Sequence, residues 1–302
     1  MKTHQLLVQF MHPGCECIPT SPPKMGGDPT LNIWNTGNHT RKFIKAEGAY
    51  IDSLNGNSHS AVIEFWGEWE PYSYVSRLNE IPAPGLPCFI HEPFLKVPPG
   101  YTNEQNTDPF VFGDHFHYVC CRQLSGGNAT KLRYLAPGSV ILFGSHLNGK
   151  FILDTLFVVG EKFIDVNKNN FHSLPDKVVS RAYFDISIRP IFEQQSSASC
   201  SSSLKKSSCC PPESYRLYFG ATFKEPYQDM YSFFPCKPFD GNPTGFSRPV
   251  IDHPSVNPKL KLNWKRLQTE QPNTVFWKDI ARRVLRQGLL LGVFAEMPKN
   301  EK

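Results

Sequence analysis

The chain has 302 residues, of which 40% are hydrophobic and 20% are charged, and its net charge is +5. This composition is typical of a globular protein and excludes a fibre or a wholly disordered chain. A mildly basic chain permits a polyanionic partner without requiring one.

Missing patterns exclude further classes of protein. No run approaches the roughly 18 apolar residues of a membrane span, and the opening MKTHQLLVQFMHPG lacks the apolar length and the cleavage site of a signal peptide. The sequence has no G-x-x-x-x-G-K-[ST] loop, no G-x-G-x-x-G after a strand, no G-x-S-x-G elbow and no zinc-deaminase spacing. We therefore expect a cytoplasmic protein without membrane contact, in which the nine cysteines are reduced.

The first half of the chain predicts strands separated by ordered loops. LLVQF (6–10) is an opening strand, and the stretch 12–30 is a loop because of its many prolines and glycines. AVIEFWGEW (61–69) is a strand whose continuous apolar run fits burial on both faces. A turn at 106–109 leads to another strand that begins at Phe116.

The second half contains the clearest pattern, a β-hairpin over residues 136–163. Two apolar runs flank Asn148-Gly149, which is a strong hairpin signal. Further strands are predicted at 183–192 and 215–223. Between them, the serine-rich residues 194–212 carry almost no apolar side chains, so we interpret them as a mobile low-complexity insertion.

The chain closes on a helix that follows an extended, aromatic-rich loop at 230–251. Asn273 or Thr274 can cap this helix, and Gly288 ends or interrupts it. One side of the helix is apolar. A basic stripe on another side has one cation at every fourth residue and consists of Lys278, Arg282 and Arg286.

These elements predict an α+β fold that is predominantly β. We expect a mixed or antiparallel sheet, or a partly closed barrel, with a few helices that include the C-terminal one. We also expect residues 1–302 to form a single compact domain that contains the insertion at 194–212.

The stretch FWGEWEPYS (65–73) is the first candidate site. The alternation of a strand puts Trp66, Glu68 and Glu70 on one face, with Phe65 and Trp69 on the other. An indole can stack on a base while a carboxylate accepts from the N–H edge of that base. We expect Trp66 and Glu68 to face a ligand. The alternative is that the tryptophans are core residues and the glutamates pair with Arg or Lys.

Two groups could supply polar pocket residues or metal ligands. One contains Asp108, Asp114, His115 and His117, and the other is His12-x-x-Cys15-x-Cys17. Neither has the further spaced ligands that a zinc site requires. We therefore expect no metal and no cofactor, and we interpret Asp108, Asp114 and His117 as pocket lining.

Arg248, in the loop GFSRP (245–249), suits a carboxylate or a phosphate. With Arg41, Lys42 and the basic stripe it could form an anion site. The alternative is an ordinary structural salt bridge.

The hairpin GSVILFGSHLNGKFILDTLFVV resembles the central strands of PUA-like domains, including the EVE type. This resemblance implies a small β-barrel with an aromatic-lined pocket for a base, often a modified one. On physical grounds Trp66, Trp69 and Phe143 are then the first candidates for that pocket. The strings HPG, FWGEWEP, NTDPFVFGD and GFSRP together also resemble those of bacterial proteins of unassigned function.

Three functions follow from these patterns. The first is binding of a nucleotide or a modified nucleobase, free or in nucleic acid, in an aromatic and acidic pocket. The second is an enzyme acting on a nucleotide or sugar-like substrate with Glu68 and Glu70 as paired carboxylates. The third is a protein-interaction module that uses aromatic loops. A solidly packed Trp66 and Glu68 would favour the third. The pattern leaves the oligomeric state undetermined.

Overall fold

The structure is a computed structural model. It describes residues 5–12, 31–32, 40–79, 83–97, 100, 105–197, 214–241, 244–259, 264–266 and 271–301.

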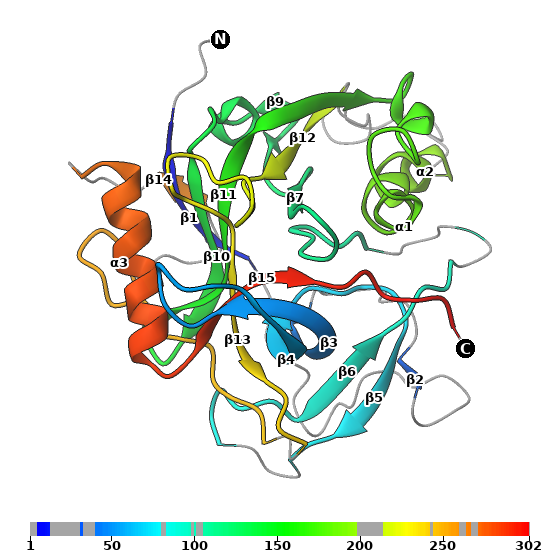
Figure 1. The fold of residues 1–302 in the computed structure, drawn as a ribbon. Coiled ribbons are helices and arrows are strands. Elements are labelled where there is room, and N and C mark those ends of the chain that lie inside the picture. The colour runs from blue at the N-terminus through cyan, green and yellow to red at the C-terminus, as the bar shows by residue number, and fades with distance from the viewer. Residues whose placement is uncertain are drawn as a thin grey trace.

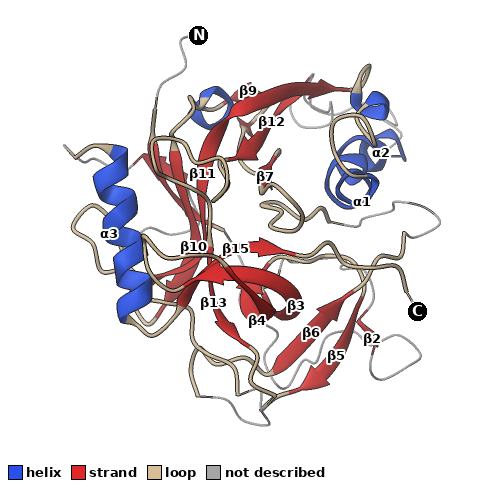
Figure 2. Cartoon of the chain, in the orientation of Figure 1, coloured by secondary structure: helices blue, strands red, loops and turns tan. Residues whose placement is uncertain are grey.

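Strands dominate the fold, as the sequence predicts, and most of them belong to two mixed sheets (Figures 1 and 2). The order of the first sheet is β14 (Trp264–Arg266), β1 (Leu7–Met11), β10 (Val140–Leu147), β11 (Lys150–Asn167), β12 (Ser214–Gly220) and β7 (His117–Tyr118). In this sheet β1 and β10 are parallel, and the other neighbours are antiparallel.

The second sheet closes partly on itself. Its order is β15 (Leu290–Ala295), β13 (Phe234–Pro238), β4 (His59–Gly67), β3 (Lys42–Ile51), β6 (Phe89–Pro93), β5 (Ser73–Arg77) and β2 (Leu31–Asn32). Because β15 also pairs with β3, the four strands β3, β4, β13 and β15 form a closed barrel. A separate two-stranded ribbon consists of β8 (Leu124–Ser125) and β9 (Asn128–Ala129).

The helical segments are few, and the longest is at the C-terminal end. They are η1 (Lys131–Tyr134), η2 (Phe171–Ser173), α1 (Arg181–Tyr183), the π-helical turn η3 (Phe184–Ile188), α2 (Arg189–Ser197) and α3 (Asn273–Arg286). None of the helices in the described part of the chain is both long and apolar enough to span a membrane.

The predicted hairpin and the predicted end of the C-terminal helix are both confirmed. β10 and β11 are joined at Asn148 (φ 48°) and Gly149 (φ 77°), and two successive positive φ angles are what a tight hairpin turn requires. Helix α3 ends at Arg286, and Gly288 follows with φ 74°. The residues after Gly288 then form β15 rather than more helix.

The predicted strand at 183–192 is wrong, because this segment is helical. Ser180 caps α1 by accepting a hydrogen bond from the backbone N–H of Tyr183, and Asp185 forms an i,i+4 ion pair with Arg189. Pro190 has no N–H to donate in a helix, and its ring would clash with the carbonyl of the residue four positions earlier. The wide π turn immediately before it accommodates this residue.

Two apolar clusters occupy opposite faces of the strands. On β10, Ile141 and Phe143 belong to one cluster while Val140 and Leu142 belong to the other. Helix α3 covers the second cluster with one buried side, made of Phe276, Trp277, Ile280, Ala281 and Val284 (Figure 1).

Two predicted loops lie wholly or partly outside the described residues. Of the predicted loop at 12–30, the structure describes only His12. Of the interpreted insertion at 194–212, it describes only residues 194–197. The backbone of 194–197 belongs to α2. The predicted loop at 230–251 contains strand β13.

Candidate functional site

The aromatic and acidic stretch at the end of β4 alternates as predicted, but both of its faces are buried. Phe65 and Trp69 belong to one apolar cluster and Trp66 to the other. The Trp66 indole donates a hydrogen bond to the carbonyl of Phe246 (2.7 Å) and is only 3% exposed. The predicted ligand-facing tryptophan is therefore a packed interior residue.

Glu68, which follows β4, belongs to a chain of buried charges. Its Oε2 accepts from Nη1 of Arg41 at 2.7 Å, and Nε of Arg41 donates to Asp154 at 2.8 Å. Asp154 also accepts from Arg248 at 3.0 Å, and the Arg248 guanidinium lies 5.0 Å from the centre of the Trp66 ring. We call His12, Arg41, Glu68, Asp154 and Arg248 the interior charge network.

Burial opposes the charge of Arg41, but the carboxylates of Asp154 and Glu68 raise its pKa above the ordinary value. Arg41 and Arg248 thus meet on Asp154, and their charges are neutralised inside the protein. This matches the alternative of a structural salt bridge. Next to this network, Glu70 is buried against Lys42 (3.5 Å).

Within the interior charge network, His12 is the residue that contacts a cysteine. Nη2 of Arg41 lies 2.7 Å from Nδ1 of His12, and Arg can only donate, so Nδ1 accepts. The ring proton is then on Nε2, which donates to Sγ of Cys121 at 3.3 Å. In this tautomer His12 is an N–H donor to the sulfur and not a base that could remove the thiol proton.

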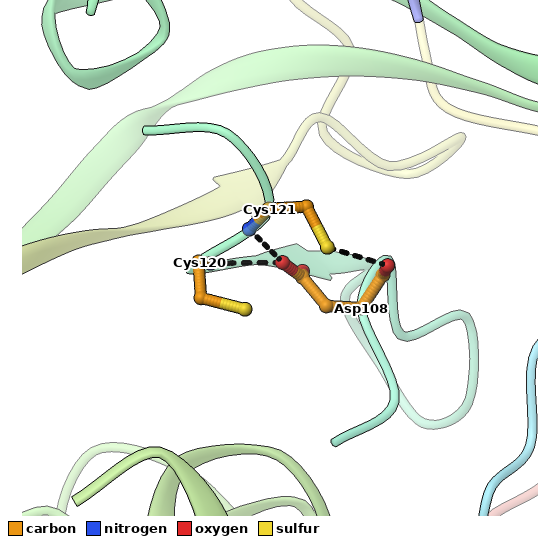
Figure 3. Close-up of side chains that lie close together, drawn as sticks. All are labelled: Asp108, Cys120 and Cys121. Carbon is orange, nitrogen blue, oxygen red and sulfur yellow. Dashed lines mark hydrogen bonds between the residues drawn. The ribbon is translucent and has the colours of Figure 1, made fainter. Parts of the chain in front are cut away.

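Asp108 anchors the turn that carries Cys121 and its neighbour Cys120 (Figure 3). Its carboxylate accepts from the backbone N–H groups of Val119 (2.9 Å), Cys120 (2.8 Å) and Cys121 (2.8 Å). Burial raises the pKa of Asp108, and these three hydrogen bonds oppose that rise. The pKa of Cys121 lies well above its ordinary value because its side chain is hydrogen-bonded to Cys120 and is buried.

The other predicted pocket residues do not converge on one site. His117, on β7, is buried and stacks on Tyr183 with ring centres 4.2 Å apart, and burial lowers its pKa to about 3. Asp114 is exposed. Phe143 is fully buried and packs against Phe10 and Tyr118.

The basic stripe on α3 differs from these buried groups because it faces outward. Arg282 and Arg286 are exposed and Lys278 is half-buried. Within the described part of the chain, none of the three forms an ion pair. We call this set the α3 cation face.

A hollow lies beside the α3 cation face and has a volume of about 430 Å³. Arg282 contributes to it together with Asp279, Arg283 and Val275, whose side chain is 46% exposed. The remaining wall comes from His253, Pro254 and Ser255, which precede β14, and from Gln271, which lies just before α3. The hollow therefore combines a cation that no described acidic group pairs, a carboxylate that is bonded to Arg283, and an apolar surface.

Sequence reasoning missed Asp154, Cys120 and Cys121 as members of polar clusters, and it missed the hollow. Asp154 sits in the apolar run FILDTLFVV, and a lone acid in such a run is a usable sign of a buried ion pair. The hollow joins residues 253–255 to the first turns of α3, and no local pattern predicts that junction.

Comparison of the chain with protein-family models, with curated proteins and with solved structures gives no match.

Proposed function

We propose that the protein binds a nucleotide or a nucleobase, free or in nucleic acid, at the α3 cation face and its adjoining hollow. The observation that carries the proposal is the position of Arg282, an exposed cation with no acidic partner among the described residues, at the edge of a hollow that also offers an apolar wall. A phosphate needs the first feature and a base needs the second.

The spacing of the cations suits a phosphate backbone. Residues four apart on a helix are separated by a rise of about 6 Å, so Lys278, Arg282 and Arg286 span about 12 Å. Along one strand of a duplex this length corresponds to roughly three to four nucleotides at 3.4 Å each. Neighbouring cations are therefore about two nucleotides apart, so the three side chains could contact alternate phosphates of one strand.

The hollow has the size and chemistry for a base or a single nucleotide. Ligand sites typically measure about 300–1,000 Å³, and 430 Å³ lies in that range. Oδ2 of Asp279 accepts from Arg283 (3.0 Å), whereas Oδ1 has no hydrogen bond to any described residue. That oxygen can accept from the N–H edge of a base, while Val275 and Pro254 offer apolar contact.

Two other functions are less well supported. An enzyme with Glu68 and Glu70 as its acid and base would need carboxylates that reach substrate, but they are buried in ion pairs with Arg41 and Lys42. The packed Trp66 and Glu68 favour a protein-interaction module by the criterion given above, but such a module would also need exposed rings in its aromatic loops. In the loop at 230–251, Phe233, Phe234 and Phe246 are buried and Phe239 is half-buried.

A binding titration at several salt concentrations tests the proposal. The probes are a mixed-sequence single-stranded DNA, the same sequence as RNA, and the four nucleoside monophosphates. We expect K278E/R282E/R286E to weaken oligonucleotide binding. Its salt dependence should also flatten by about two in the log–log slope, because each lost phosphate contact removes about 0.7.

The matched control is K150E/K168E/K177E, which makes the same change in net charge at three exposed lysines away from α3. This control should bind more tightly than the α3 variant and keep the slope of the unmutated protein. Equal weakening in both variants, or failure of the unmutated protein to bind any of the probes, would contradict the proposal.

A further inference from the structure

The strongest cluster of metal-ligating side chains is separate from the α3 cation face. Asp108, Cys120 and Cys121 each offer one ligand atom, and these atoms lie within 4.8 Å of one another. His12 adds an imidazole, whose Nε2 lies 3.3 Å from Sγ of Cys121. The four side chains come from three separate places in the chain, which is why sequence spacing does not reveal them.

We propose that this cluster is a binding site for a soft divalent cation such as Zn²⁺, with Cys120, Cys121 and His12 as ligands and Asp108 as the fourth donor. Two thiolates with an imidazole are a ligand set that favours zinc over the hard cations Mg²⁺ and Ca²⁺. The proposal is independent of nucleotide binding.

One nitrogen–sulfur pair already has the spacing of a zinc site, although His12 lies outside the group of three whose ligand atoms are all within 4.8 Å of one another, so the imidazole must move toward the ion when it binds. In a tetrahedral zinc site the Zn–S and Zn–N distances of about 2.3 and 2.0 Å place a sulfur and a nitrogen ligand about 3.5 Å apart. The observed separation of His12 Nε2 and Cys121 Sγ is 3.3 Å. The two sulfurs and a carboxylate oxygen of Asp108 all lie within 4.8 Å of one another, so the three can reach one ion.

Two of the four donors are partly accessible. Cys120 and Cys121 are half-buried, whereas Asp108 and His12 are buried. The backbone N–H groups that hold Asp108 also fix the turn that presents both sulfurs (Figure 3). Asp108 therefore holds the turn that carries both sulfurs before any cation binds.

The residues that contact Nδ1 of His12 can hold the ring in place when a cation binds. Binding of a cation at Nε2 requires the ring proton to move to Nδ1, and the two thiol protons leave to solvent. Oε2 of Glu68 lies 3.4 Å from Nδ1 and can accept the relocated proton, which is the usual carboxylate–histidine–metal arrangement. Nη2 of Arg41 donates to Nδ1 in the absence of metal, so it must turn away from the protonated nitrogen, while Nη1 keeps Glu68 and Nε keeps Asp154.

Cobalt binding to the reduced, chelator-treated protein tests the site. We expect about one Co²⁺ per chain, with a near-ultraviolet charge-transfer band that reports thiolate ligation and disappears when Zn²⁺ is added. In the same unmutated protein, Zn²⁺ should slow the alkylation of Cys120 and Cys121, located by peptide mass spectrometry, and should leave the other cysteines unchanged.

The isosteric variants C120S and C121S should lose the band, and H12Q should weaken it. The control C88S removes a buried cysteine in a different cluster and should keep it. A thermal melt without metal shows whether each variant is folded. The proposal is overturned if the unmutated protein shows no thiolate band, if the band survives in C120S/C121S, or if Zn²⁺ protects other cysteines instead.

Discussion

Arg41 and Arg282 show how differently two arginines are placed in one protein. Arg41 is buried, and two carboxylates and a histidine surround its guanidinium. Arg282 is exposed on α3, and no described acidic group pairs with it. A buried charge must be neutralised within the fold, whereas an unpaired exposed one remains available to a ligand. The same kinds of residue therefore stabilise the interior around Arg41 and form a candidate binding surface on α3.

The largest effect should come from removing Arg41. R41M leaves Glu68 without its guanidinium partner and Asp154 with only Arg248, in a region from which water is excluded. We expect a loss of about 3–5 kcal/mol in the free energy of unfolding, measured by urea denaturation.

The control for this variant is K45M, on β3, the strand that Arg41 immediately precedes. Lys45 forms an ion pair of 2.7 Å with Glu92, but both side chains are partly exposed. Because solvent screens this pair, its removal should cost less than about 1 kcal/mol. Similar losses in R41M and K45M would contradict the distinction between interior and surface charges.

A smaller effect is expected from E68Q. A pocket-facing Glu68 would tolerate this nearly isosteric change, but the observed side chain is bonded to Arg41. The amide oxygen can still accept from Arg41, but the change removes a negative charge that balances a buried guanidinium, which should cost about 1.5–3 kcal/mol in the free energy of unfolding. The exposed control E92Q should stay within about 0.5 kcal/mol of the unmutated protein. An E68Q protein as stable as E92Q would return Glu68 to the ligand-binding candidates.

The last effect is the dependence of stability on pH, which is measured as a slope rather than as a single free-energy difference. Burial lowers the pKa of His117 from 6.5 to about 3, so between these values the unfolded chain binds a proton that the folded chain does not. The contribution of neutral His117 to the free energy of unfolding is complete above pH 6.5 and is lost as the pH falls toward 3. H117F, which keeps an aromatic ring against Tyr183, should reduce the slope of unfolding free energy by about 1.4 kcal/mol per pH unit in this window.

The control for H117F is H146Q, at an exposed histidine. It should keep the slope of the unmutated protein. An unchanged slope in H117F would show that His117 is protonated equally in the folded and unfolded chain.

Local signals in the sequence predicted much of the fold. The Asn148-Gly149 turn, the apolar run of β4 and Gly288 after α3 each act through neighbouring residues, and the structure confirms all three. The segment 183–192 was mispredicted because its β-branched and aromatic residues favour a strand, while burial against the core selects a helix. The strand propensity of its isoleucines is a weaker influence than that packing.

The candidate sites were predicted less well because they depend on contacts between distant residues. The alternation of Phe65, Trp66 and Trp69 is correct, but period-2 alternation cannot tell a pocket from a second core. His12 meets Cys121, 109 residues away, and this meeting depends on the pairing of β1 with β10 and on the Asp108 turn. Only the α3 cation face, whose residues repeat along one helix, could be derived from the sequence.

Photo-cross-linking tests the central claim most directly, because it shows which region of the unmutated protein touches a nucleic acid. A bound RNA carrying 4-thiouridine is cross-linked, and the modified peptides are identified by mass spectrometry. We expect cross-links in residues 253–259 and 271–287, which contain the hollow and the α3 cation face. Cross-links concentrated in residues 59–70, with α3 unmodified, would contradict the account and show that β4 is the ligand-binding region.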